Sequence, residues 1–436
     1  MKQNRREFIK KAGLGIGLFT ILPRPVLGKL NGDTRYTAPS DQLTRGIIGV
    51  GGIGMSDLHF ASDERCRLVA VCDVDKYHLR RALDAGEERF GTRLQPYSDW
   101  RDLVHDANVD IVHIATPSHW HGIMAVEAAK AGKDIFCEKP MTRTIGEGEK
   151  VVKAVHDNGR IFRLDTWFRF TDTFYGLGTT VEPLKKLVMS GELGWPLTVR
   201  ISESTGFAWK FYWTGRTDLT PQPIPDELDY DMWLGPAPYK PYHPHRIHQT
   251  FRGYWDYESG GLGDMGQHYI DPVQYILGKD DTYPVKVEVD APRQDADAVG
   301  VWRRITYTYA DGCKIILEGE GFETPGKVPY IEGPKGKVYK GFECTIPNVQ
   351  DLVNSLPAPP PRHTDFLDCV RTRQHFALDE IIGHHSCTIV NIGSCALRLG
   401  RNLEFDPASC RFVGDDEANA LINQPMRAPW AQYMSV

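Results

Sequence analysis

A glycine-rich turn between an apolar run and a later acidic residue constrains this fold more than any other feature of the sequence. Residues 46–50 are typical of a short buried strand, and a G-x-G-x-x-G motif follows, made of Gly49, Gly51, Gly52, Ile53 and Gly54. Glycines at these positions allow a tight turn, a close approach of the backbone to a pyrophosphate, and close packing of the next helix. The motif predicts a dinucleotide-binding domain.

The next apolar run indicates which dinucleotide is bound. Residues 68–72 are typical of a second buried strand, which ends in Asp73. An acidic residue about 20 positions after the glycines accepts ribose hydroxyls in dinucleotide folds, and its charge repels a 2′-phosphate. The pattern therefore favours NAD over NADP. Lys76 and Arg80 are the nearby residues that would accommodate the phosphate of NADP.

Strand and helix patterns continue to alternate after Asp73. Helices are expected at residues 77–90, 120–131 and 145–156, and strands at 110–115, 134–137 and 161–164. This alternation predicts an α/β fold whose N-terminal Rossmann domain, residues 44–165, is a doubly wound parallel sheet. Strands expected at 197–203, 285–289, 305–309 and 314–318 predict a second, α+β domain over residues 166–436, with a large, mostly antiparallel open sheet. We expect the C-terminal helices to pack back on the first domain.

The N-terminus has the features of an export signal. Arg5 and Arg6 lie in the run NRREFIK, and the apolar run at 12–22 is too short to span a bilayer. We predict a twin-arginine signal peptide at residues 1–28, a linker at 29–43, and export to the periplasm as a folded protein without stable membrane insertion. Whether the signal is cleaved stays open.

Composition is that of an ordinary globular enzyme. The chain has 436 residues, a net charge of −6 and no basic block, which argues against a nucleic-acid partner. Its nine cysteines are an odd number, and two of them lie at the ends of expected buried strands, so they do not form a disulfide framework.

Two motifs follow expected strands at the edge of the sheet where ligands bind. Residues 115–121 read ATPSHWH, and residues 137–140 read CEKP. Together with GGLGDMGQHYID at 260–271, they resemble the Gfo/Idh/MocA family of sugar and cyclitol oxidoreductases over nearly all of the chain after the signal. The resemblance implies a cofactor edge that includes Thr116, Pro117, His119, His121, Glu138, Lys139 and Trp167.

The chemistry of three residues agrees with this resemblance. Lys139 follows a strand at the ligand edge, where an ammonium beside a positively charged nicotinamide should have a lowered pKa and could bind or deprotonate a hydroxyl. Asp264 and His268 are four residues apart, on one face of a helix. Because the pKa of histidine is near neutral, His268 is the expected general acid/base, and Asp264 would hold the substrate. Arg169, Trp255 and Tyr257 complete the expected substrate site, in and beside an aromatic-rich stretch at 207–262.

Several interpretations stay open. The protein is expected to be an NAD-dependent oxidoreductase acting on a sugar or glycoside, with hydride exchanged between a ring carbon, for instance C3, and a tightly held nicotinamide. A second possibility resembles the family's NAD-dependent glycoside hydrolases, which oxidise, eliminate, hydrate and re-reduce their substrate. A third is a cofactor-bound sugar-binding protein. No metal is expected, although the close spacing of His243, His245 and His248 suggests a metal site. A homo-oligomer formed through the C-terminal sheet is expected.

Overall fold

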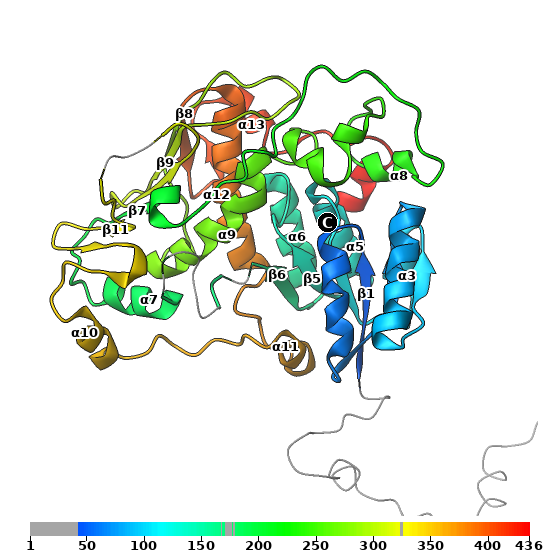
Figure 1. Ribbon diagram of the computed structural model, residues 1–436, viewed down its shortest axis with the longest axis horizontal. Coiled ribbons are helices and arrows are strands. Elements are labelled where there is room, and N and C mark those ends of the chain that lie inside the picture. Colours follow the sequence, from blue (N-terminus) through cyan, green and yellow to red (C-terminus); the bar gives the residue numbers. More distant parts are fainter. Residues whose placement is uncertain (1–41, 167, 171–176, 178, 323–325) are drawn as a thin grey trace, which may run out of the picture.

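The computed structural model describes residues 42–166, 168–170, 177, 179–322 and 326–436 (Figure 1). The predicted signal peptide, nearly all of the predicted linker and Trp167 lie outside the described residues. No helix of the described part of the chain is long and apolar enough to cross a membrane.

The first sheet has six parallel strands in the order β3-β2-β1-β4-β5-β6. Nearly every residue of β1, β4 and β5 is buried, as expected for a parallel sheet covered on both faces. The strands are β1 (Leu43–Ile48), β2 (Cys66–Cys72), β3 (Gln95–Tyr97), β4 (Ile111–Ile114), β5 (Asp134–Glu138) and β6 (Phe162–Asp165). The order reverses between β1 and β4, where ligands bind in such sheets.

Helices cover this sheet, and their ends carry recognisable signals. The helix after β2 begins where the Asp75 side chain accepts a hydrogen bond from the Tyr77 N–H, and it ends at Gly91 with φ +61°. The helices of the first domain are α2 (Ile53–Ser56), α3 (Lys76–Phe90), α4 (Trp100–His105), α5 (His121–Lys130) and α6 (Ile145–Asp157).

The second sheet has eight strands in the order β12-β11-β7-β10-β9-β8-β13-β14. All neighbours are antiparallel except β7 and β10, so the predicted fold class is confirmed. The strands are β7 (Thr198–Ile201), β8 (Lys286–Asp290), β9 (Arg304–Thr308), β10 (Lys314–Glu318), β11 (Ile331–Glu332), β12 (Lys337–Val338), β13 (Leu403–Asp406) and β14 (Arg411–Phe412).

Two long helices connect the domains. The buried α9 (Gly260–Leu277) packs against α12 (Glu380–Leu399), and α12 also packs against α6 of the first domain (Figure 1). Phe366, Phe376 and Trp430 belong to the core of the first sheet, so the C-terminal part of the chain returns to the first domain. The remaining helices are α7 (Val181–Met189), α8 (Tyr230–Leu234), α10 (Val349–Ser355), α11 (Phe366–Thr372) and α13 (Asp416–Ala420).

Residues 207–259, here called the crossing segment, reach from the second domain to the first. The Lys76 N–H donates to the Glu227 carbonyl at 3.0 Å, and the Asp229 N–H donates to the Val74 carbonyl at 3.0 Å. The side chains of His119 and Trp120 contact the Trp233 carbonyl. The crossing segment is thereby fixed over the carboxyl ends of the parallel strands.

Candidate active site

A large cavity lies between the carboxyl ends of the first sheet, the crossing segment and the start of α9. Its volume is about 1380 Å³, which exceeds the usual size of a small-molecule site and suits a dinucleotide with a second ligand. Eleven of the predicted site residues line it: Gly49, Gly51, Gly52, Ile53, Asp73, Thr116, Pro117, Glu138, Lys139, Asp264 and His268.

The glycine turn leaves space that side chains would fill. Gly49 has φ +85°, and a Cβ added there would lie 2.7 Å from the Ala115 carbonyl oxygen. A Cβ on Gly54 would lie 1.9 Å from the Gly49 carbonyl oxygen, so only glycine lets the helix start approach the strand. A Cβ on Gly52 would meet no atom within 4 Å, which leaves open space beside the backbone. The turn therefore fits the pyrophosphate of a dinucleotide.

Asp73 links the end of β2 to this turn. Its Oδ2 accepts a hydrogen bond from the Val50 N–H at 2.8 Å, and its Oδ1 accepts one from the Asp75 N–H at 2.9 Å. The residue is 9% exposed and lines the cavity, so it can also face a ribose. The cations at this end differ from those expected, because His78 and Arg81 line the cavity, whereas Lys76 Nζ donates to the Asp226 carbonyl.

Lys139 and Asp264, which are 125 positions apart in the sequence, form an ion pair. Lys139 Nζ donates to the Asp264 carbonyl at 2.8 Å and to its carboxylate Oδ1 at 3.0 Å. Arg252 Nε also donates to Oδ1, at 2.8 Å, and Lys210 Nζ lies 2.7 Å from Oδ2. Burial by itself would raise the pKa of Asp264, but these three cations hold it below its usual range. Asp264 is therefore a fixed anion shared by three cations.

His268 lies one helical turn after Asp264 on α9. Its Nδ1 is 2.9 Å from the Thr166 hydroxyl, which leaves Nε2 as the ring nitrogen for a substrate hydroxyl. Burial, with the nearby charge of Lys139, lowers the pKa of His268 well below the near-neutral value expected from the sequence. The imidazole is thus neutral before substrate binds. It can accept a proton but holds that proton weakly.

His119 and His121, which were predicted to lie at the cofactor edge, are buried and do not line the cavity. His121 lies between the carbonyls of Thr116 and Pro140, each 2.8 Å from one ring nitrogen, and burial lowers the pKa of His121 to about 4. Burial likewise lowers the pKa of His119 to about 3. These neutral rings hold the loop that carries Thr116 and Pro117.

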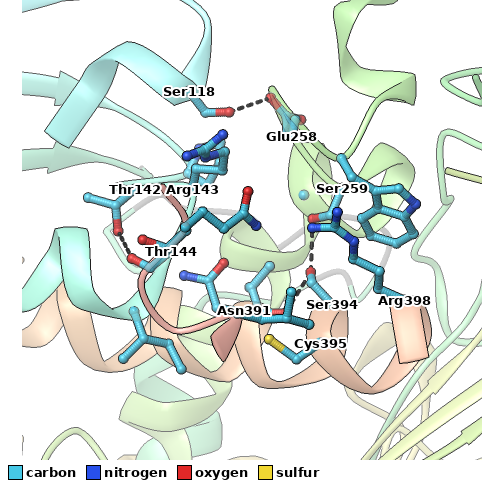
Figure 2. Close-up of a pocket in the computed structure, with 17 residues that line it drawn as sticks. Ser118, Thr142, Arg143, Thr144, Glu258, Ser259, Asn391, Ser394, Cys395 and Arg398 are labelled. Atoms are coloured by element: carbon cyan, nitrogen blue, oxygen red, sulfur yellow. Dashed lines mark hydrogen bonds between the residues drawn. The ribbon is translucent and has the colours of Figure 1, made fainter. Parts of the chain in front are cut away.

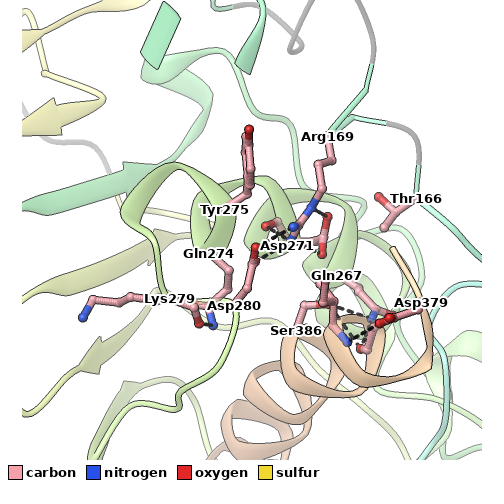
Figure 3. A network of polar contacts seen from close by, with 12 residues as sticks. Thr166, Arg169, Gln267, Asp271, Gln274, Tyr275, Lys279, Asp280, Asp379 and Ser386 are labelled. Atoms are coloured by element: carbon pink, nitrogen blue, oxygen red, sulfur yellow. Dashed lines mark hydrogen bonds and ion pairs between the residues drawn. The ribbon is translucent and has the colours of Figure 1, made fainter. Parts of the chain in front are cut away.

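Arg169 has a structural role that differs from the predicted substrate contact (Figure 3). It is 2% exposed, donates from Nε to Asp271 Oδ2 at 2.9 Å, and donates from Nη1 to Asp280 Oδ2 at 2.8 Å. A guanidinium occupied by two carboxylates inside the protein has no donor directed at the cavity. Its predicted substrate role is therefore corrected.

The aromatic residues of the crossing segment divide into two groups. Trp255 is 4% exposed and donates from Nε1 to the Asp295 carbonyl, and Tyr257 is fully buried beside Trp233. Neither lines the large cavity, so the prediction that they bind substrate there is also corrected. The aromatic side chains of the crossing segment that do line it are Trp209, Tyr212, Trp213, Trp233 and Phe251.

Three charged cavity residues of the second domain were not predicted from the sequence: Lys210, Arg252 and Glu258. All three belong to the crossing segment, where they are interspersed among aromatic residues. The aromatic-rich stretch at 207–262 was the available signal for them. No local pattern distinguishes these three from neighbouring polar residues such as Lys240.

The three histidines at 243–248 do not converge. His243 Nδ1 accepts from the His245 N–H at 3.0 Å, and His245 Nδ1 lies 2.6 Å from the Tyr254 hydroxyl. His248 instead lies in the cavity, with Nε2 3.4 Å from Asp75 Oδ2. The sequence spacing therefore does not correspond to one ligand set.

The fold and the site define a two-domain dinucleotide-binding protein with an acid–base cluster at the second domain's buried helix. Residues 43–166 match the NAD-binding Rossmann fold of the Gfo/Idh/MocA oxidoreductases, and residues 177–432 match the C-terminal alpha/beta domain of that family. The chain belongs to the Gfo/Idh/MocA oxidoreductase family, as predicted, and NAD is confirmed as the cofactor of its first domain.

Curated relatives match parts of the chain. Inositol 2-dehydrogenase of Salmonella typhimurium is 31% identical over 207 residues, which are 45% of this chain and 56% of the relative. Glycosyl hydrolase family 109 protein 2 of Shewanella sp. (strain ANA-3) is 43% identical over 113 residues, 24% of this chain and 25% of the relative. The chain thus spans about half the length of the first of these relatives and a quarter of the second.

Solved structures share the fold over most of the chain. The WlbA dehydrogenase from Bordetella pertussis, in complex with NADH and UDP-GlcNAcA, superposes with a TM-score of 0.57 at 20% identity, covering 84% of this chain and 99% of that one. The aldose-aldose oxidoreductase from Caulobacter crescentus, complexed with glycerol, gives a TM-score of 0.53 at 19% identity, covering 84% and 100%. At these identities the similarity establishes the fold.

Proposed function

We propose that this protein is an NAD-dependent oxidoreductase that acts on a sugar or glycoside. The observation that carries this proposal is the convergence of Lys139, Asp264 and His268 in the cavity that the glycine turn also lines. The cofactor, when bound, supplies a hydride acceptor and donor, and C3 is the ring carbon we assign to the exchange. The WlbA and aldose-aldose oxidoreductase names are consistent with sugar substrates.

Residues of the chain bind the substrate and transfer its proton. In this proposal Lys139 Nζ, held by Asp264, binds the reacting hydroxyl, and the neutral His268 accepts its proton. The cavity-facing Trp209, Tyr212 and Trp213 offer aromatic faces to the C–H groups of a sugar. A sugar-binding protein without catalysis would leave this acid–base cluster without a role.

We also propose that the cofactor stays bound through many turnovers. The crossing segment is hydrogen-bonded to the first domain at Lys76 and Val74, beside the adenosine end of the cavity. If residues 1–28 direct export to the periplasm, no free NAD would be available there, and a slow off-rate would decide occupancy. A retained cofactor must be reset in place, by a second sugar or by return of the same hydride.

A second candidate function is an NAD-dependent glycoside hydrolase, in which oxidation is transient and the net reaction is hydrolysis. The segment that is 43% identical to a glycosyl hydrolase family 109 protein favours it. Incubation with a panel of aryl glycosides, following both aglycone release and ketosugar formation, tests both functions. Stable ketosugar selects the oxidoreductase, aglycone release with a complete sugar product selects the hydrolase, and no product from any sugar contradicts the proposal.

A further inference from the structure

Glu258 lies between the large cavity and a second, smaller one. This second cavity, here called the rear chamber, has a volume of about 30 Å³ and is lined by Arg143, Ser259, Asn391, Ser394 and Arg398, among others (Figure 2). Glu258 and Ser118 line both cavities. The chamber is lined by both polar and apolar side chains and has room for a water molecule.

The Glu258 carboxyl is buried and only partly bonded. The residue is 5% exposed, and its Oε2 lies 3.2 Å from the Ser118 hydroxyl, whose single proton also faces the Tyr257 carbonyl at 2.6 Å (Figure 2). Its Oε1 is buried without a hydrogen-bond partner among the described residues, and Arg252 Nε lies 3.8 Å away. A buried carboxyl oxygen with no donor is costly if it is charged, so this position favours a proton on the group.

The structure makes specific room for this side chain. A Cβ added to Gly263, on the first turn of α9, would lie 2.7 Å from Glu258 Cγ. Glycine at position 263 therefore allows Glu258 to pack against the helix that carries Asp264 and His268. The carboxyl is fixed relative to the proposed catalytic residues rather than left free to turn into solvent.

Burial and the neighbouring charges together bring the pKa of Glu258 close to neutral pH. Burial is the largest influence and raises its pKa, the positive charge of Arg252 lowers it, Asp264 raises it, and Lys139 lowers it again, giving a pKa of about 7. Arg143 and Arg398 also line the rear chamber. A carboxyl with such a pKa can take up or release a proton at neutral pH, unlike Asp264.

We propose that Glu258 is the proton store of this active site, taking the hydroxyl proton from His268 during oxidation and returning it during reduction. This inference rests on the proposed function. Oxidation of an alcohol releases a proton as well as a hydride, and the buried His268 holds that proton only weakly. In the transfer, the N–H bond of the imidazolium breaks and an O–H bond forms on the Glu258 carboxylate, with water in the cavity that both residues line relaying the proton between them.

The rear chamber gives Glu258 a second side from which it can exchange a proton. In a cycle that returns its hydride in place, the proton must also come back, so a site inside the protein serves better than bulk water. Two hydroxyls of the chamber are hydrogen-bonded to each other, Ser394 Oγ donating to Ser259 Oγ at 2.9 Å. Water there can exchange the stored proton between cycles.

The test uses the full-length protein with its bound NAD. Glu258→Gln keeps the size of the side chain but cannot ionise, and Glu258→Asp keeps a carboxyl. Infrared spectroscopy should show a protonated carboxylic acid in the unmodified protein that titrates near pH 7, within about one unit. This band should be missing in Glu258→Gln and present in Glu258→Asp. The exposed Glu203, changed to Gln, is the matched control and should leave the band unchanged.

Kinetics supply the second readout. Glu258→Gln should lower kcat about a hundredfold and remove the ionisation near neutral pH from the pH profile, while NAD content stays unchanged. Glu258→Asp should recover part of the rate. An unmodified protein without a titrating carboxyl, or a Glu258→Gln variant with an unchanged pH profile, would overturn the proposal. Inactivity of the unmodified protein on every sugar would instead contradict the proposed function, and the infrared titration would still decide whether Glu258 exchanges a proton.

Discussion

Lys139 Nζ lies 3.0 Å from Asp264 Oδ1, and this ion pair joins the carboxyl end of strand β5 to the first turn of helix α9. The lysine side chain is 11% exposed and the aspartate side chain 2%, so the pair lies at the floor of the cavity. Two further cations, Lys210 and Arg252, share the same carboxylate. The contact therefore fixes the two domains at the point where the proposed chemistry occurs.

The first prediction concerns Lys139. Lys139→Met keeps most of the apolar stem and should leave the fold and NAD content intact, because Arg252 and Lys210 still compensate the charge of Asp264. Loss of the ammonium should lower kcat about a hundredfold or more. The measurement is steady-state turnover on the sugar found active, with NAD content as the control. Near-normal turnover would make the lysine structural.

The second prediction concerns Asp73. Because its carboxylate accepts the Val50 N–H and lines the cavity, Asp73→Ser should loosen the glycine turn and weaken NAD binding. It should also improve NADP binding relative to NAD, since Arg81 lines the same end and the repulsion of a 2′-phosphate is removed. Fluorescence titration of both reduced cofactors into stripped protein measures the ratio. An unmodified protein that prefers NADP would contradict the assignment.

The third prediction is that the cofactor is retained. Protein purified without added nucleotide should contain about one NAD(H) per chain, because the crossing segment is bonded to the first domain over the cavity, which slows release. Denaturing the protein and measuring the released nucleotide by absorbance tests this. Such protein should also turn over without added NAD. Empty protein that needs supplied NAD and releases one reduced cofactor per turnover would exclude retention.

The fourth prediction separates structure from catalysis at Arg169. Arg169→Met should lower the free energy of unfolding by about 3 to 5 kcal/mol, because it leaves the buried Asp271 and the partly buried Asp280 without their partner. Turnover of the protein that remains folded should change little. Urea denaturation and kinetics at low temperature measure the two effects. A large loss of kcat/KM with unchanged stability would restore the substrate role predicted from the sequence.

The fifth prediction is a pH dependence of stability at His384. Burial, with the neighbouring His385, lowers the pKa of His384 to about 3, whereas an unfolded histidine titrates near 6.5. Below about pH 6.5 the unfolded chain binds a proton at this histidine that the folded chain does not. The free energy of unfolding therefore falls with the pH, by up to about 1.4 kcal/mol per pH unit. Other buried groups titrate too, so the comparison is with His384→Asn. Urea denaturation at pH 7 and 5.5 should show a smaller loss for the variant, and equal losses would contradict the assignment.

Much of the first domain was predictable because its signals are local. The strand, glycine turn, helix and Asp73 occupy one short stretch, and Gly49 and Gly54 have steric reasons that any Rossmann fold imposes. The family resemblance added Lys139, Asp264 and His268, which the structure brings to one cavity. Their catalytic roles, the export signal and the oligomeric state remain predictions.

The sequence by itself determined the fold class, the cofactor and the pair of motifs that carry Lys139 and His268, since these depend on short-range spacing. Tertiary structure decided which polar and aromatic side chains face the cavity. Trp255 and Tyr257 are buried in the core, whereas Lys210 and Arg252 contact Asp264 and Glu258 lines the cavity. The difference depends on how the crossing segment folds over the first domain. That path is set by contacts between residues more than a hundred positions apart, such as that between Trp120 and Trp233, which no local periodicity encodes.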